Sequence, residues 1–248
     1  MSALNLPLGP NSNAFGIADD GSICGWMGGT PSTGAHAFIW KAGITTDLGA
    51  VLDRAVGAEA LSISNSGSVC GRAIYPDPNF TIKRHGFLWV DGKAQDLGFL
   101  PGLAHCSPQG VNSSNVVVGF GHQSGMPTTA FVWRNGVMTA LNDLIDPQLN
   151  LDIDIAHAIN DAGQIAGQAD VLDGSADRVA VRLTPIPSPI GDSDCDGDID
   201  TDDLLGVINN WADQSPKGSK ALPPCDFDHD GTVELDDLMI VIDNWSEK

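Results

Sequence analysis

The chain has 248 residues, of which 42% are hydrophobic, and it contains 29 glycines and 15 prolines. This composition is typical of a folded protein rich in turns and not of a disordered chain. The formal net charge of -20 makes nucleic acid and anionic membranes poor partners, and no apolar run approaches the ~20 residues that span a bilayer.

The first fifteen residues, MSALNLPLGPNSNAF, have neither a basic start nor a long apolar core. A secretory signal peptide has both features, so no signal peptide is visible in this chain. The five cysteines are an odd number, so at least one is unpaired or pairs with another chain.

Residues 1–185 contain an internal repeat in four copies. One line of the repeat reads AFGIADDGSICGW, ALSISNSGSVCGR, PQGVNSSNVVVGF and AHAINDAGQIAGQ. A second line reads HAFIWKAG, HGFLWVDG and TAFVWRNG, with a degenerate fourth copy, RVAVRLTP. The first three copies then continue with the closing segments ITTDLG, KAQDLG and VMTALN. The final glycines of the first line recur at a nearly constant spacing, as Gly25, Gly71, Gly119 and Gly167.

Each copy predicts four short strands separated by turns. The turn signals DDG, NSG and DAG separate the first two strands, and Asp91-Gly92 and Asn135-Gly136 separate the last two. Asp-Gly and Asn-Gly between apolar runs are strong hairpin signals. Four short strands in about 46 residues are the size of one β-propeller blade. The sequence therefore predicts a mainly β fold, a four-bladed β-propeller of ~46-residue repeats.

The two ends of the repeat region predict how the ring closes. The fourth copy stops at RLTPIP without a closing segment, and the chain begins with ALNLPLG, which resembles a closing segment without its own repeat. We expect this N-terminal strand to complete the last blade, because closure removes an exposed sheet edge. The alternative is a piece of a larger ring, left open or dimeric.

The HAFIW-type strand carries a Phe-x-Trp pair whose two rings lie on one face of the strand. We expect these rings to form the packing between blades, although an aromatic binding cage is an alternative. Because His36 and His85 recur before two of the pairs, we interpret them as structural hydrogen-bonding residues at turns and not as metal or catalytic groups. The pairs are Phe38 and Trp40, Phe87 and Trp89, and Phe131 and Trp133.

The repeat resembles the HAF family of extracellular repeats, which is named for its His-Ala-Phe signature. The resemblance covers about residues 1–185 and rests on HAFIW, HGFLW, the G-I-x-x-x-G-x-x-x-G lines and the DLG closures. It implies an extracellular location and a repeat architecture, and it implies no particular reaction.

After a Pro-rich linker at 186–190 the composition changes. Residues 191–248 contain 16 acidic and 3 basic residues, and the stretch DSDCDGDIDTDD, which begins at Asp192, recurs as DFDHDGTVELDD from Asp226. Two like charges ~4 Å apart repel by about 1 kcal/mol even in water, so a folded loop of this kind needs a cation at its centre. The alternative is an acidic, solvated tail.

The spacing of the acidic residues fits a twelve-residue calcium loop. Ca²⁺ takes 6–8 oxygen ligands, and each stretch offers them at positions 1, 3, 5, 7, 9 and 12 with a glycine, Gly197 or Gly231, at position 6. The apolar residue at position 8, Ile199 or Val233, would anchor each loop to the core. We therefore predict two bound Ca²⁺ ions. The predicted ligands are Asp192, Asp194, Asp196, Asp198, Asp200 and Asp203 in the first loop and Asp226, Asp228, Asp230, Thr232, Glu234 and Asp237 in the second.

A helix is predicted after each loop, in DDLLGVINNW and DDLMIVIDNW. The acidic residues at the start of each helix suit its dipole, and apolar residues recur at helical spacing, which predicts one apolar face. These residues are Leu204, Leu205, Ile208 and Trp211, recurring as Leu238, Met239, Ile242 and Trp245.

This duplicated unit of a loop and a following helix resembles the dockerin type I module over residues 191–248. The resemblance implies a small α-helical, EF-hand-like calcium-binding domain that docks onto a cohesin-like protein partner. Cys195 inside the first loop and Cys225 before the second could form a bridge that staples the loops, or both could be free thiols. Cys24 and Cys70 hold equivalent repeat positions and are predicted to be small buried hydrophobes.

Together the two modules predict a non-enzymatic, extracellular or cell-surface calcium-binding protein. The propeller would present a binding surface to a ligand that the sequence does not name, and the dockerin-like module would attach the protein to a partner. The alternative is an accessory or catalytic component of polysaccharide degradation, since dockerins often accompany glycoside hydrolases. A glycosidase needs two carboxylates that face one cleft, but Glu59 is the only Glu of the repeats, and Asp47 and Asp96 belong to the closing segments.

Overall fold

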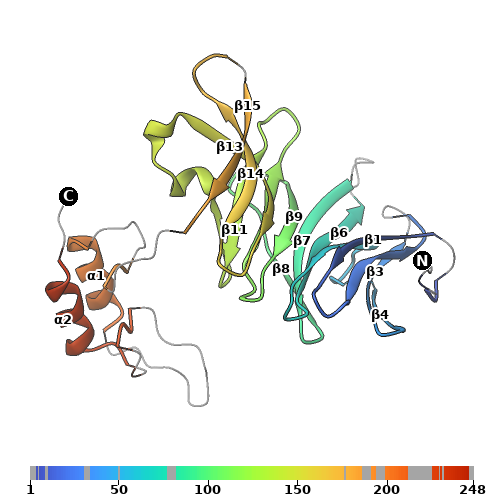
Figure 1. The fold of residues 1–248 in the computed structure, drawn as a ribbon, viewed down its shortest axis with the longest axis horizontal. Coiled ribbons are helices and arrows are strands. Elements are labelled where there is room, and N and C mark those ends of the chain that lie inside the picture. The colour runs from blue at the N-terminus through green and yellow to red at the C-terminus, as the bar shows by residue number, and fades with distance from the viewer. Residues whose placement is uncertain are drawn as a thin grey trace. The chain divides into compact units, whose positions relative to one another are not determined.

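The computed structural model describes residues 4, 6–8, 11–30, 34–49, 51–76, 82–175, 177–185, 191–193, 199–211, 225–228, 230 and 232–245. The chain divides into two units, a repeat unit, Met1–Thr184, and a C-terminal unit, Pro185–Lys248 (Figure 1). Among the described residues, neither unit has a helix with the length and apolar character needed to cross a membrane.

The repeat unit consists of four antiparallel sheets, one from each copy of the repeat, and the predicted mainly β fold is therefore confirmed. Strands that follow one another in the chain are neighbours in each sheet. Sheet 1 contains β1 (Ser12–Ile17), β2 (Ile23–Gly28), β3 (Ala35–Lys41) and β4 (Ile44–Gly49). Sheet 2 contains β5 (Gly57–Ile63), β6 (Val69–Pro76), β7 (Ile82–Val90) and β8 (Lys93–Asp96).

The third and fourth sheets follow the same order, with two short 3-10 helices between them. Sheet 3 contains β9 (His105–Val111), β10 (Val117–His122), β11 (Thr129–Arg134) and β12 (Val137–Ala140). The 3-10 helices are η1 (Leu141–Leu144) and η2 (Pro147–Leu149). Sheet 4 has three strands among the described residues, namely β13 (Leu151–Ile159), β14 (Ile165–Val171) and β15 (Arg178–Leu183).

Two-residue turns join the third and fourth strands of sheets 1 to 3, as the Asp-Gly and Asn-Gly signals predict. Both residues of Asp91-Gly92 and of Asn135-Gly136 have positive φ, and Ala42-Gly43 adopts the same conformation in sheet 1. This geometry matches the right-handed twist of the strands that it joins. Local sequence therefore sets the pairing of these hairpins.

The glycine that recurs in the second strand of each copy faces a β-bulge in the neighbouring strand. In sheet 2, Ala60 pairs with Gly71 and Ser62 pairs with Cys70, which leaves Leu61 as the bulged residue. A Cβ atom placed on Gly71 would lie 1.9 Å from the carbonyl oxygen of Glu59. No side chain fits this position, so the bulge explains why each copy keeps a glycine there. The bulged residues of the other sheets are Phe15, Gln109 and His157.

Consecutive sheets pack face to face. We call the face of a sheet that packs on the next sheet its forward face, and the opposite face its backward face. Between sheets 1 and 2, Cys24 and Ala37 of the forward face pack with Val69 and Phe87 of the backward face. Between sheets 2 and 3, Cys70 and Leu88 pack with Val117 and Phe131. Between sheets 3 and 4, Val118 and Ala130 pack with Ile153 and Ile165. Trp89 and Trp133 pack in the first two of these clusters, which confirms that the aromatic pairs of sheets 2 and 3 are core residues.

The predicted closure by the N-terminal strand is wrong for the described residues. Residues 4 and 6–8 belong to no strand, and the Leu8 side chain lies against Gly28 of sheet 1. Sheets 1 and 4 lie at opposite ends of the row of sheets (Figure 1).

The C-terminal unit contains two helices, α1 (Thr201–Asn209) and α2 (Leu235–Asp243). Both begin with a capping box, in which the side chain of the N-cap residue and that of the third helical residue each accept a backbone N–H of the other. Four buried side chains form the centre of the small core, and Ile199 and Val233 are two of them, so the predicted anchoring of the loops is confirmed. The other two are Val207 and Val241.

Candidate metal centre

Asp237 forms hydrogen bonds with both ends of the second acidic loop. It is the third residue of α2 and is fully buried. Its Oδ1 accepts the backbone N–H of Phe227 at 2.6 Å, and its Oδ2 accepts that of Glu234 at 3.0 Å. The loop therefore folds back on the first turn of the helix, with a carboxylate at the meeting point.

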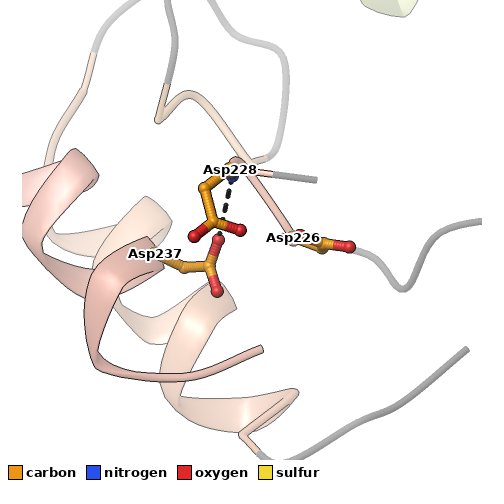
Figure 2. A group of neighbouring side chains, drawn as sticks. All are labelled: Asp226, Asp228 and Asp237. Atoms are coloured by element: carbon orange, nitrogen blue, oxygen red, sulfur yellow. Dashed lines mark hydrogen bonds between the residues drawn. The ribbon is translucent and has the colours of Figure 1, made fainter. Parts of the chain in front are cut away.

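Three of the predicted ligands converge on that carboxylate. One carboxylate oxygen each from Asp226, Asp228 and Asp237 lies within 4.8 Å of the other two. Figure 2 shows the carboxylates of Asp228 and Asp237 next to each other, with a hydrogen bond of 3.3 Å from the Asp228 N–H to Asp237 Oδ1. Oxygens that bind one Ca²⁺ at about 2.3–2.6 Å lie within about 5 Å of each other. The spacing of these three oxygens fits a calcium ion.

The charges in this cluster repel one another. The backbone N–H of Asp230 lowers the pKa of the Asp228 carboxyl, but desolvation and the carboxylates of Asp230, Asp237 and Asp226 raise this pKa, and the net effect is upward. A raised carboxyl pKa means that its surroundings disfavour negative charge. A cation bound here would remove that penalty.

The other three predicted residues of the second loop have different partners. Asp230 Oδ1 accepts the N–H and the hydroxyl of Thr232, both at 2.8 Å, and these bonds lower the pKa of Asp230. The Glu234 side chain is exposed and accepts the backbone N–H of Asp237 in the capping box. Of the five predicted acidic ligands of this loop, the structure brings Asp226, Asp228 and Asp237 together, and Asp230 and Glu234 are not part of this cluster.

The first loop repeats the arrangement around Asp237. Asp203 is buried, and its Oδ1 and Oδ2 accept the backbone N–H groups of Ser193 and Asp200. Asp192, at the first position of this loop, is also buried. Asp200 caps α1 by accepting the N–H of Asp202 at 2.8 Å. The remaining predicted ligands, Asp194, Asp196 and Asp198, lie outside the described residues.

The predicted apolar face of each helix is wide, and only one of its two stripes packs in the core. Leu204 and Val207 of α1, and Leu238 and Val241 of α2, face the small core. The other stripe is exposed on both helices. Leu204 and Leu205 are neighbours in sequence but lie about 100° apart around a helix, so one packs in the core and the other faces solvent. The exposed residues are Leu205 and Ile208 of α1, Leu235, Met239 and Ile242 of α2, and Trp211 and Trp245 just after the two helices.

Cys225 is a free thiol in the structure. Its Sγ lies 3.8 Å from Asn210 Nδ2, and burial raises the pKa of the thiol. Its predicted partner, Cys195, lies outside the described residues. Of the two alternatives for this pair, the structure has the free Cys225.

The repeated histidines of the repeat unit make structural contacts, as predicted. His36 Nδ1 lies 2.9 Å from the Asp47 carboxylate, which also accepts the N–H of Gly49. His85 and Asp96 form the equivalent pair at 2.8 Å. These bonds hold β4 on β3 in sheet 1 and β8 on β7 in sheet 2.

Two further predictions for the repeat unit concern buried groups. Cys24 is fully buried, and burial raises the pKa of its thiol to about 12, so it is a small core residue as predicted. Cys70 is buried in the same way. Glu59 is buried and forms an ion pair with Arg72, whose Nε donates to Glu59 Oε2 at 3.0 Å. Its carboxylate is therefore held in a cross-strand pair of sheet 2.

Sequence reasoning missed a histidine pair in sheet 3, because neither residue recurs in the other copies. The rings of His105 and His122 stack with their centres 4.6 Å apart. Desolvation lowers the pKa of both side chains, and His122 adds to the effect on His105. The His122 Nδ1 atom is buried and makes no hydrogen bond with any described group.

No family model and no curated protein matches the sequence. Among solved structures, the chain is similar to the β-propeller domain of the Trilobed protease from Pyrococcus furiosus, which is described as having an open velcro topology. The identity is 9%, the TM-score is 0.35, and the match covers 72% of this chain and 70% of that chain.

Proposed function

We propose that the C-terminal unit binds two Ca²⁺ ions, one in each acidic loop, and that the metal stabilises the fold of this unit. The observation that carries the proposal is the convergence of Asp226, Asp228 and Asp237 on the start of α2. The equivalent burial of Asp192 and Asp203 supports a second site of the same kind.

The cost of burying carboxylates supports a cation. Burying an ionised carboxylate is expensive unless a countercharge and hydrogen bonds compensate. The described residues of the C-terminal unit include no Lys, Arg or His. Backbone N–H groups supply hydrogen bonds but no net positive charge, whereas a divalent cation supplies both ligation and charge. Hard oxygen donors favour Ca²⁺ over transition metals.

The exposed stripes support a role in attachment to another protein. Exposed apolar side chains occur at equivalent positions in the two halves, namely Ile208 of α1 and Ile242 of α2, with Trp211 and Trp245 just after the helices. Large exposed apolar residues that are contiguous mark interaction surfaces. A cohesin-like domain is the partner that the dockerin resemblance implies, and it would pack on one of these stripes.

For the repeat unit we propose a binding role in a secreted or cell-surface protein. The four sheets, with strands in chain order and consecutive sheets packed face to face, would be successive blades of a β-propeller whose loops present the binding surface. The burial of Glu59 in its pair with Arg72 favours this role over catalysis of polysaccharide hydrolysis, the alternative function.

Isothermal titration calorimetry on the full chain tests the calcium proposal. We expect two Ca²⁺ ions per chain, with heat that disappears when chelator is in excess. Mg²⁺ is the control cation, because it demands a smaller, near-octahedral site and should bind more weakly. A chain that takes up no Ca²⁺, or that takes up Ca²⁺ without saturation, would contradict the proposal.

A further inference from the structure

Among the described residues, no sheet packs on the β1 part of the backward face of sheet 1, whereas Met27 and Phe38 on the same face are fully buried. Ile17 is 71% exposed, whereas the residues at the same position of the next two copies, Ile63 and Val111, are 7% and 5% exposed. Ala14 is exposed too, although Ala60 at the same position of the second copy is fully buried. These residues are of the same kind and occupy the same place in the first strand of their sheets, so the difference arises from the missing neighbour.

The forward face of sheet 4 is open in the same way. Ala166 of β14 is exposed, whereas Cys24 and Cys70 at its position in the first two copies are fully buried. Ala180 of β15 is exposed, whereas Ala37 at its position in sheet 1 is fully buried. The two ends of the row thus expose the counterparts of the two halves of an interface that forms three times within the chain, with Arg182 in sheet 4 at the position that Leu88 holds in sheet 2.

We propose that the backward face of sheet 1 packs on the forward face of sheet 4 in a second copy of this chain, so that copies associate head to tail. Ile63 lies in a cluster with Cys24 and Ala37 of the preceding sheet. Ile17 holds the position of Ile63, and Ala166 and Ala180 hold the positions of Cys24 and Ala37. Ile17 of one copy would therefore lie against Ala166 and Ala180 of the other. These alanines are small and leave space for the isoleucine. A second copy is the occupant because the two faces of one chain lie at opposite ends of its row of sheets (Figure 1).

Hydrogen bonds between the turns of consecutive sheets support the same pairing. The N–H of Asp19 in sheet 1 donates to Asn65 Oδ1 in sheet 2 at 2.9 Å. At the same position of the turns in sheets 3 and 4, the N–H of Ser113 donates to Asp161 Oδ1 at 2.8 Å. At the free ends, Asp161 offers the equivalent N–H, and the Asp19 carboxylate offers the equivalent oxygens, of which Oδ2 already accepts Asn65 Nδ2 of sheet 2 at 2.8 Å. A further hydrogen bond of this kind would therefore use Asp19 Oδ1.

A head-to-tail contact uses two different surfaces, so copies add into a ring if the rotation closes and into an open filament if it does not. Blocking either surface leaves the other one free. This property separates head-to-tail pairing from a symmetric dimer, in which one surface meets itself.

The test is the mass of the full chain in solution, measured by light scattering after size-exclusion chromatography across a concentration series. We expect the wild type to associate, and we expect Ile17→Glu and Ala180→Glu each to be monomeric. A mixture of these two variants should form a dimer, because Ile17→Glu keeps its sheet 4 face and Ala180→Glu keeps its sheet 1 face. Ile44→Glu is the matched control, since Ile44 is 72% exposed but lies on the forward face of sheet 1.

Circular dichroism would show that each variant is folded. A wild type that stays monomeric at every concentration would overturn the proposal, and so would a mixture of the two variants that does not associate. Loss of association in Ile44→Glu would show that another surface mediates it.

Discussion

Asp203 and Asp237 occupy the same place in the two halves of the C-terminal unit. Each is the third residue of its helix, is buried, and accepts backbone N–H groups from both ends of the loop before it. Each carboxylate thus links one loop to one helix, so a substitution of one carboxylate should affect only the calcium site of its own loop.

Asp203→Asn should remove the first calcium site and leave the second, and Asp237→Asn should do the reverse. Asparagine keeps the shape of the side chain but removes its charge, and it offers one ligand oxygen in place of two. Calorimetry should count one ion in each variant and none in the double variant. Asp173→Asn, an exposed aspartate of the repeat unit, is the control and should still bind two. Two ions in the double variant would exclude these loops as the sites.

Calcium should raise the unfolding temperature of the C-terminal unit in the full chain. Binding to the folded state alone stabilises it by about 2.7 kcal/mol per site when free Ca²⁺ is about 100 times the dissociation constant. Calorimetric scans with Ca²⁺ and with chelator should show one transition that shifts. The transition of the repeat unit should stay in place. If chelator leaves both transitions unchanged, metal binding is not coupled to folding here.

Attachment through the exposed stripes should depend on Ile208 and Ile242, which are equivalent residues of α1 and α2. The double variant Ile208→Glu/Ile242→Glu places a charge in each stripe and should lose capture by an immobilised type I cohesin domain in Ca²⁺. Calorimetry should still count two ions in this variant, because neither side chain belongs to the loops. Capture of the wild type that persists in chelator would contradict a calcium-dependent attachment.

Local chemistry in the sequence predicted the strands and their turns. Asp91-Gly92 specifies a two-residue hairpin wherever it occurs between apolar runs, because both residues tolerate positive φ. The open end of the row could not be predicted in this way. Ile17 and Ile63 are the same residue in the same local pattern, and only the presence of a neighbouring sheet makes one buried and the other exposed.

For the candidate metal centre, the sequence predicted the residue types and not their partners. The twelve-residue spacing pointed to Asp226, Asp228 and Asp237, which converge, but equally to Asp230, whose carboxylate is held by Thr232. The choice between these partners depends on the turn geometry of the loop. In the helices, periodicity identified the apolar residues, but it did not show that Leu205 faces solvent.

Gly71→Ala should destabilise the repeat unit, because a Cβ atom there would lie 1.9 Å from the carbonyl oxygen of Glu59. The backbone at the bulge must shift to relieve this clash, and overpacking of this kind typically lowers the free energy of unfolding by about 1–3 kcal/mol. Lys93→Ala in the same sheet is exposed and should change the unfolding free energy by no more than about 0.5 kcal/mol. Denaturant unfolding of both variants measures the difference. Equal stability would mean that the bulge is not a fixed feature of the sheet.

The stacked pair of His105 and His122 should make the repeat unit less stable as the pH falls. Desolvation lowers the pKa of both histidines in the folded state, whereas in the unfolded chain they bind protons near pH 6.5. Below that pH the unfolded state holds more protons than the folded state, and stability therefore falls with pH until the folded-state pKa values are reached.

His122→Phe should reduce the loss of stability at low pH, because phenylalanine can stack on His105 and binds no proton. The Nδ1 atom that the change removes makes no hydrogen bond with any described group, so the variant should fold at neutral pH. The measurement is the transition temperature of the repeat unit in calorimetric scans between pH 7.5 and 5.5, with His157→Asn as the control for loss of an exposed histidine. A slope in His122→Phe equal to that of the wild type would show that this pair does not set the pH dependence.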